Sequence, residues 1–234
     1  MDEFINEYYN LITRGVEFLA AFTGILVFKK YKHTPTKTII YFLIYAFWVD
    51  FIGSYPSFLY KNDLFYLIEG TLIQRNYWWF TIFWWIGLSV FVSYINYQII
   101  ENNRLKKIIK YSFYLYIVQI LLSIAFRFEY LFTPNEQFIK IASFWMVSLS
   151  IIVYYFELLG SDRIIQFYKS VYFYFNSALF CWILIMIPMD FFEKYFVPED
   201  VAYIMLKYKI YLSLNIFLYL TFTTALIFCK PQTR

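Results

Sequence analysis

The chain has 234 residues, of which 62% are apolar, 26% are aromatic and 15% are charged, with a formal net charge of +4. An ordinary soluble domain has about 45–50% apolar and about 25% charged residues. This composition leaves too few polar residues to cover a soluble globule, and its apolar content excludes a disordered chain. Together with a mean hydropathy of +0.55, it indicates an integral membrane protein.

Seven stretches are long and apolar enough to cross a bilayer, which takes about 20 residues per helix. We expect membrane spans at residues 5–28, 38–59, 77–99, 111–128, 138–159, 171–191 and 208–228. They are apolar all round the helix and lack the short period-two segments of a barrel. The first stretch is the weakest, because Glu7, Arg14 and Glu17 interrupt it. The sequence therefore predicts an all-α fold, with a single seven-helix transmembrane domain over residues 1–234.

Lysine and arginine set the expected orientation, because the cytoplasmic connections of membrane proteins carry an excess of both. Twelve of the 20 lie in one set of connections, at residues 29–37, 104–110, 163–169 and 230–234, and six lie in the opposite set. We therefore expect the N-terminus outside and the C-terminus in the cytoplasm. On the outer side, apolar residues within 60–76 predict a brief helix lying in the membrane interface.

The sequence offers little for catalysis, metal binding or nucleic-acid binding. His33 is the one histidine, and the two cysteines, Cys181 and Cys229, fall within or beside apolar stretches. Zinc sites draw on three or four His and Cys ligands, and no HExxH, CxxC, GxSxG or P-loop pattern is present. The basic residues lie in short connections and form no continuous face. We therefore expect no metal, no cofactor and no nucleic acid. A catalytic function in the membrane is disfavoured, because the chain shows no nucleophile or histidine positioned beside its acidic residues.

Polar side chains within the predicted spans are costly in lipid, so they mark candidate functional residues. The candidates for a ligand or ion pocket are Arg14, Glu17, Asp50, Gln119, Asp190 and Asn215, with Trp84 as an aromatic wall. Arg14 and Glu17 lie three residues apart on one helical face, so they either neutralise each other or line an outward-facing cavity. Asp50 has only Ala46 and Ser54 one turn away, so it needs another helix or water. Packing against neighbouring helices or lipid is the alternative for Asp50 and for Trp84.

Charged residues at the expected cytoplasmic face form a second group. We interpret Glu157, Arg163, Arg104 and Lys107 as an anchor that fixes the topology, with docking of a partner protein as the alternative. Glu157 could pair with Arg163 or with the basic run at residues 104–110.

Three runs of residues resemble a known group of proteins. They are Lys-Lys-Tyr-Lys-His-Thr-Pro at 29–35, Tyr-Phe-Glu-Leu-Leu at 155–159 and Asn-Ile-Phe-Leu-Tyr at 215–219, and they are similar to runs in small, uncharacterised bacterial seven-helix membrane proteins. The resemblance covers nearly the whole chain and implies the same fold, without an assigned activity. The topology resembles that of rhodopsins and seven-helix receptors only by analogy, since Lys207 and Lys209 lie at the outer end of the last span, not deep within it as a retinal Schiff base requires.

Two functions remain open for a protein that we expect in the lipid bilayer of a bacterial inner membrane. The first is a non-enzymatic, receptor-like or signalling module that senses a small molecule or ion through an outward-facing pocket and acts on a membrane signalling partner. The second is a small-solute or proton- or cation-coupled transporter. Asp50 and Glu17 favour it, as does a weak three-plus-one-plus-three echo that places Pro56 on Pro188.

Overall fold

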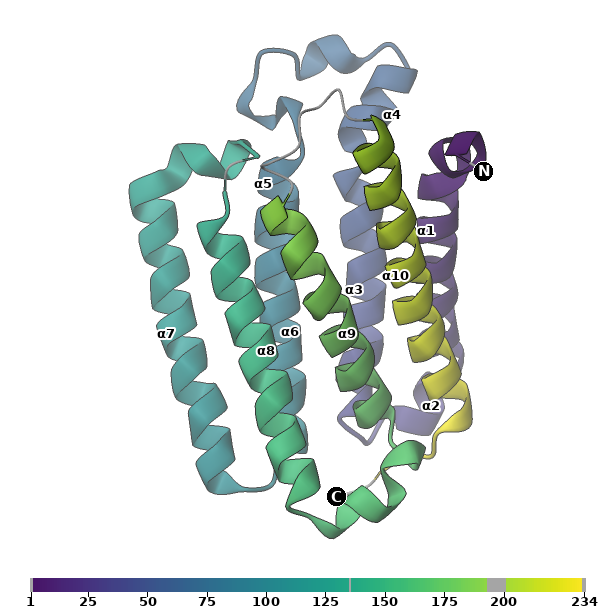
Figure 1. The fold of residues 1–234 in the computed structure, drawn as a ribbon, viewed down its shortest axis with the longest axis vertical. Coiled ribbons are helices and arrows are strands. Elements are labelled where there is room, and N and C mark those ends of the chain that lie inside the picture. The colour runs from purple at the N-terminus through teal and green to yellow at the C-terminus, as the bar shows by residue number, and fades with distance from the viewer. Residues whose placement is uncertain (1, 135, 193–200, 233–234) are drawn as a thin grey trace. The chain divides into compact units, whose positions relative to one another are not determined.

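The computed structural model describes residues 2–134, 136–192 and 201–232, without the side chains of 2–7, 190–192 and 201–202. Every regular element in these residues is a helix (Figure 1), which confirms the all-α prediction. The chain divides into two compact units. Unit 1 contains Met1–Ile44 and Arg163–Arg234, and unit 2 contains Tyr45–Asp162. The boundary falls within one helix, α3 (Thr36–Gly53).

Among the described residues, six helical segments are long and apolar enough to cross a membrane. They are Thr36–Lys61, Tyr77–Ile99, Asn103–Phe132, Phe138–Leu159, Val171–Met189 and Tyr203–Phe228. They overlap six of the seven predicted spans, so the chain is a helical protein of multi-pass membrane type. The first predicted span corresponds to helix α1 (Asp2–Leu26), which is not among the six and which carries Arg14 and Glu17. That this first predicted span also crosses the membrane, which would make seven spans, stays a prediction. The orientation stays a prediction as well.

Unit 1 is built around helix α10. Its elements are α1, the short helix α2 (Phe28–Tyr31), the first part of α3, most of the 3₁₀ segment η5 (Asp162–Lys169), α9 (Val171–Phe192) and α10 (Val201–Phe228). Helix α10 packs against both α1 and α9. In the core, the ring of Phe175 lies 5.9 Å from that of Phe42 and 5.2 Å from that of Phe222, centroid to centroid. Gly24 allows α1 to approach Ile40 of α3, since a Cβ there would lie 3.0 Å from the Ile40 side chain.

Helix α2 closes the C-terminal end of α10. The ammonium group of Lys30 donates to the carbonyl oxygens of Leu226 and Ile227, at 3.2 and 3.0 Å. The hydroxyl of Tyr31 lies 3.0 Å from the Leu226 carbonyl oxygen and 2.7 Å from that of Cys229. The last carbonyl groups of a helix have no partner within the helix, and a cation beside them also opposes the helix dipole. These contacts therefore satisfy the end of α10.

The titratable groups at this helix end have shifted pKa values. Burial lowers the pKa of Lys30, with the nearby Cys229 acting in the opposite direction. Burial, followed by the proximity of Cys229 and Tyr172, raises the pKa of the Tyr31 hydroxyl. Burial also raises the pKa of the Cys229 thiol, opposed by Lys30. The Tyr31 hydroxyl therefore keeps its proton, which it needs as a donor.

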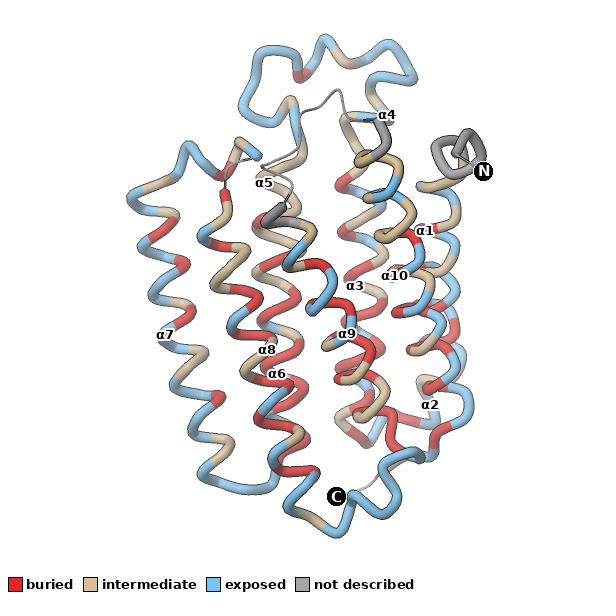
Figure 2. The backbone as a smooth tube through the Cα atoms, viewed as in Figure 1, coloured by how far each residue is buried: buried red, intermediate tan, exposed pale blue. Residues whose placement is uncertain are grey.

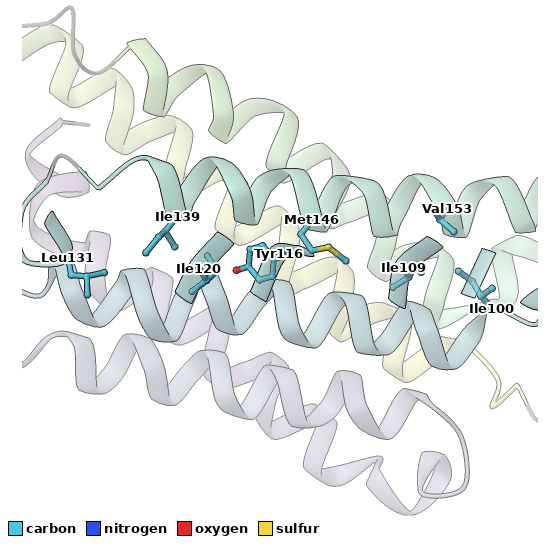
Figure 3. Packing of buried hydrophobic residues seen from close by; sticks show 8 residues of the cluster. All are labelled: Ile100, Ile109, Tyr116, Ile120, Leu131, Ile139, Met146 and Val153. Atoms are coloured by element: carbon cyan, nitrogen blue, oxygen red, sulfur yellow. The ribbon is translucent and has the colours of Figure 1, made fainter. Parts of the chain in front are cut away.

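Unit 2 contains three long helical segments and the connections at their ends. After the second part of α3 come α4 (Tyr55–Lys61), η1 (Phe65–Leu67), η2 (Leu72–Gln74), α5 (Tyr77–Trp79), η3 (Phe80–Ile86), α6 (Gly87–Ile99), α7 (Asn103–Arg127), η4 (Phe128–Phe132) and α8 (Phe138–Leu159). Helix α8 packs against α6 and α7. The apolar cluster in Figure 3 extends along the α7–α8 contact, from Leu131 and Ile139 near one end to Ile109 and Val153 near the other.

Hydroxyl groups join α6 and α8 inside this packing. The Ser89 hydroxyl lies 3.3 Å from the Ser143 carbonyl oxygen, and the hydroxyls of Ser93 and Ser150 share a 3.2 Å hydrogen bond. From α7, the Tyr116 hydroxyl shares a 2.9 Å hydrogen bond with that of Ser143. In lipid, where apolar packing between helices has little hydrophobic driving force, small residues and hydrogen bonds of this kind hold helices together.

Helix α7 begins earlier than the sequence predicted, at Asn103 rather than at residue 111. The Asn102 side chain accepts hydrogen bonds from the backbone N–H groups of Arg104 and Leu105, which is the usual N-terminal cap of a helix. The basic run at residues 104–110 therefore forms the first two turns of the helix. Hydropathy alone placed it in a loop.

The segment η3 is a π-helix, and a tyrosine from α3 accounts for it. The Tyr45 hydroxyl donates to the carbonyl oxygen of Phe83, which would accept from Gly87 in an α-helix. The Gly87 N–H instead donates to the Trp84 carbonyl. A side chain inserted into the hydrogen-bond ladder is a known cause of such distortion. The insertion also requires glycine at residue 87, because a Cβ there would collide with the Tyr45 hydroxyl and ring.

We expect Gly87→Ala to lower the midpoint of thermal unfolding of the purified protein in detergent, because Tyr45 is held in place by its hydrogen bond and by the Phe91 ring at 5.0 Å. Overpacking of this kind costs about 1–3 kcal/mol. Gly15→Ala is the matched control, since nothing among the described residues lies within 4 Å of a Cβ there. Equal midpoints for the wild type and Gly87→Ala would contradict this account.

Candidate functional site

The residues proposed for a pocket are divided between the two units. Arg14, Glu17, Asp190 and Asn215 belong to unit 1, and Asp50, Trp84 and Gln119 belong to unit 2. Each group of residues is therefore considered within its own unit. The shared pocket stays a prediction.

In unit 1, Glu17 is buried on α1 with 4% of its surface exposed, and Arg14 on the same helix is half-buried. Asn215 of α10 accepts a 3.3 Å hydrogen bond from the indole N–H of Trp182 in α9. Asn215 therefore joins two packed helices. Asp190 lies in the last turn of α9, and its side chain is outside the described residues.

In unit 2, the three candidate residues lie on different elements. Asp50 of α3 and Trp84 of η3 are half-buried, and Gln119 is exposed on α7. The backbone carbonyl of Asp50 accepts a 2.8 Å hydrogen bond from the Ser54 hydroxyl. Two cavities of unit 2, described below, are lined by other residues.

Glu157 holds the connection between α6 and α7. Its carboxylate accepts hydrogen bonds from the backbone N–H groups of Glu101, at 2.6 Å, and Asn102, at 3.1 Å. Arg104 and Lys107 are exposed on the first turns of α7, and Arg163 is exposed in η5 of unit 1. The sequence suggested cationic partners for Glu157, and that pairing stays a prediction. The structure shows that its carboxylate accepts from two backbone amides, which no pattern in the sequence indicated.

A cleft of about 450 Å³ lies within unit 2, where the chain passes from α4 back to α5. Its walls are Pro56, Ser57, Tyr60 and Lys61 of α4, Phe65 of η1, and the stretch Gln74, Arg75, Asn76 and Tyr77. The predicted interfacial helix in this region appears as the two short 3₁₀ turns η1 and η2. Phe65 of η1 and Gln74 of η2 are among the residues that line the cleft.

Hydrogen bonds from aromatic and amide side chains fix the walls of this cleft. The Tyr55 hydroxyl donates to the carbonyl oxygens of Ile73 and Arg75 and accepts from the Trp78 indole at 3.2 Å. The Asn76 amide donates to the Gly53 carbonyl at 2.7 Å, and the Trp79 indole donates to the Val49 carbonyl at 2.8 Å. These bonds tie the end of α3 to the start of α5.

The chemistry of the cleft favours a small anion. Lys61 and Arg75 supply two cations, Gln74 and Asn76 supply amides, and Tyr60 and Phe65 supply aromatic surface. Among the described residues, no carboxylate lines the cleft. Ligand pockets combine apolar walls with a few polar groups in this way, and an arginine can bind a carboxylate or phosphate with two parallel hydrogen bonds. In the sequence, Lys61 and Arg75 contribute only to the count of basic residues that sets the expected orientation.

The described residues contain no group of three or more His, Cys, Asp or Glu side chains placed to hold a metal ion. Comparison of the chain with protein-family models, with curated proteins and with solved structures gives no match. The site is therefore interpreted from its own geometry.

We expect Glu157→Ala to speed hydrogen exchange at the amides of Glu101 and Asn102, because both lose a charged acceptor worth about 1–3 kcal/mol. Glu157→Gln should have a smaller effect, since its side chain keeps one acceptor oxygen. Glu101→Ala is the control, because it removes an exposed carboxylate from the same connection and leaves these acceptors in place. Unchanged exchange in Glu157→Ala would show that the carboxylate does not hold the connection.

Proposed function

We propose that the chain is a non-enzymatic, receptor-like membrane protein that senses a small organic anion in the cleft between α4 and residues 74–77. The observation that carries the proposal is the cleft itself, whose lining residues include the cations Lys61 and Arg75 together with the aromatic residues Tyr60, Phe65 and Tyr77. In this proposal α1 also crosses the membrane, in addition to the six apolar helical segments, which makes seven spans. The cleft then opens on the outer side of a bacterial inner membrane and the basic connections lie in the cytoplasm.

A signal from this cleft has a direct structural route into the helices. The wall of the cleft is bonded through Asn76 to Gly53, the last residue of α3, and Trp79 is bonded to α3 one turn deeper. An anion that draws Lys61 and Arg75 together would change the spacing of α4 and α5. The next element along the chain is the π-helical η3, whose hydrogen-bond ladder is already interrupted by Tyr45. A ligand that favours one arrangement of such an element shifts its population.

Binding of anions by the full chain in nanodiscs of zwitterionic lipid tests this function. We expect a small carboxylate such as benzoate or citrate to raise the thermal unfolding midpoint, and glucose to leave it unchanged. Lys61→Ala and Arg75→Ala should each weaken that binding by about tenfold, since each removes a charge-assisted hydrogen bond.

Lys32→Ala is the control for this experiment, because it removes an exposed cation in unit 1 that does not line the cleft. Carboxylate binding that is unaffected by both cleft variants would exclude the cleft as the sensor. Equal stabilisation by glucose would exclude selectivity for anions.

A transporter is the second candidate, favoured by the burial of Glu17 on α1. A buried carboxylate in a membrane helix can take up a proton or bind a cation during transport. We expect proteoliposomes to show proton-coupled or cation-coupled solute flux that collapses in Glu17→Gln and Asp50→Asn. Flux equal to that of empty vesicles in the wild type would reject transport, and it would leave the anion-binding test of the cleft unaffected.

A further inference from the structure

A second cavity of unit 2, of about 380 Å³, is a groove between α6 and α7. It lies near the ends of these helices that meet at the connection 100–102. Its walls include three tyrosines, one lysine and two apolar residues, namely Tyr94, Tyr97, Tyr114, Lys110, Val90 and Phe113. The lining of the groove thus combines hydroxyl groups and a cation with apolar surface.

Lys110 of α7 lines the groove, and Lys106 of the same helix lies beside it, over the ring of the lining residue Tyr97. We call the part of the groove around these two lysines its mouth. The ammonium group of Lys110, a lining residue, lies 5.8 Å from the centre of the Tyr114 ring, and that of Lys106 lies 5.5 Å from the centre of the Tyr97 ring. Residues 106 and 110 are one helical turn apart, so both cations project to the same side of α7. In the part of the chain that the structure describes, no carboxylate lines the groove. An anionic group at this mouth would meet two positive charges and two phenol hydroxyls.

Farther along α7, the groove is followed by an exposed apolar face of this helix. The span containing α7 is only 22% buried, against 50% for the span of α8, and Figure 2 shows few buried positions along it. Tyr114, Val118 and Leu122 follow one another at four-residue spacing on one face, with 54%, 51% and 51% of their surfaces exposed. In a bilayer this face lies against acyl chains.

We propose that the groove between α6 and α7 is a binding site for one anionic glycerophospholipid. Its phosphate lies between Lys106 and Lys110, with the hydroxyls of Tyr97 and Tyr114 as donors. One acyl chain enters the groove past Phe113 and continues along the exposed face of α7. Basic pockets between transmembrane helices bind lipid headgroups in this manner. A second copy of the chain or a soluble peptide fits less well, because neither supplies an anion and a long apolar tail on one molecule.

Native mass spectrometry of the full chain, released from nanodiscs of equal parts phosphatidylglycerol and phosphatidylcholine, tests the proposal. We expect one retained phosphatidylglycerol per chain and no comparable retention of phosphatidylcholine. Lys106→Gln with Lys110→Gln should lower the retention by about fivefold for each lysine removed. Val90→Trp keeps both charges and fills one wall of the groove, so it should lower retention as well.

The matched control is Arg104→Gln with Lys107→Gln, which removes two exposed charges from the same turns of α7 outside the groove. It should leave retention nearly unchanged. An equal loss in the control and in the lysine pair would mean diffuse attraction to anionic lipid and would overturn the site. Equal retention of the two lipids, or a dimer mass that disappears in Val90→Trp, would also overturn it.

Discussion

Hydrogen bonds from tyrosine hydroxyls to backbone carbonyl groups are the interaction on which this structure depends. Tyr31 reaches carbonyls at the end of α10, Tyr45 reaches one in the π-helical η3, and Tyr55 reaches two before α5. Carbonyl groups at helix ends and in distorted turns lack an intrahelical donor, and in lipid no water replaces it. A tyrosine fills space with its ring and satisfies such a carbonyl with its hydroxyl. The chain contains 25 tyrosines.

Hydrogen bonds from side chains to the backbone also frame both candidate binding regions of unit 2. The cleft is framed by the hydrogen bonds of Tyr55, Asn76 and Trp79, which fix the end of α3 against the start of α5. The groove lies at the other end of α6, beside the connection that the Glu157 carboxylate holds. The π-helical η3 occupies the stretch between them along the chain. Binding at either end therefore acts on helices whose ends are fixed by side chains.

Composition predicted the helical membrane fold because a membrane span depends on local apolar length. Six predicted spans overlap apolar helices of the structure. The early start of α7 was missed because its cap, Asn102, precedes a basic run of low hydropathy. The cleft could not be predicted, since contacts such as Asn76 to Gly53 join residues 23 positions apart. Glu157 shows the same limit, because its carboxylate accepts from two backbone amides, which carry no residue-specific signal.

The division of the chain has a consequence for how the protein is made. Unit 2 is one continuous stretch, so its helices can close on one another as soon as α8 leaves the ribosome. Unit 1 is split, and α1 packs on α10, which is synthesised after α1 and all of unit 2. Helix α1 carries Arg14 and Glu17, two charged side chains that are costly in bare lipid. Of the described helices, α1 therefore has the longest interval between its own synthesis and that of its packing partner α10. An insertion chaperone would protect α1 during that interval.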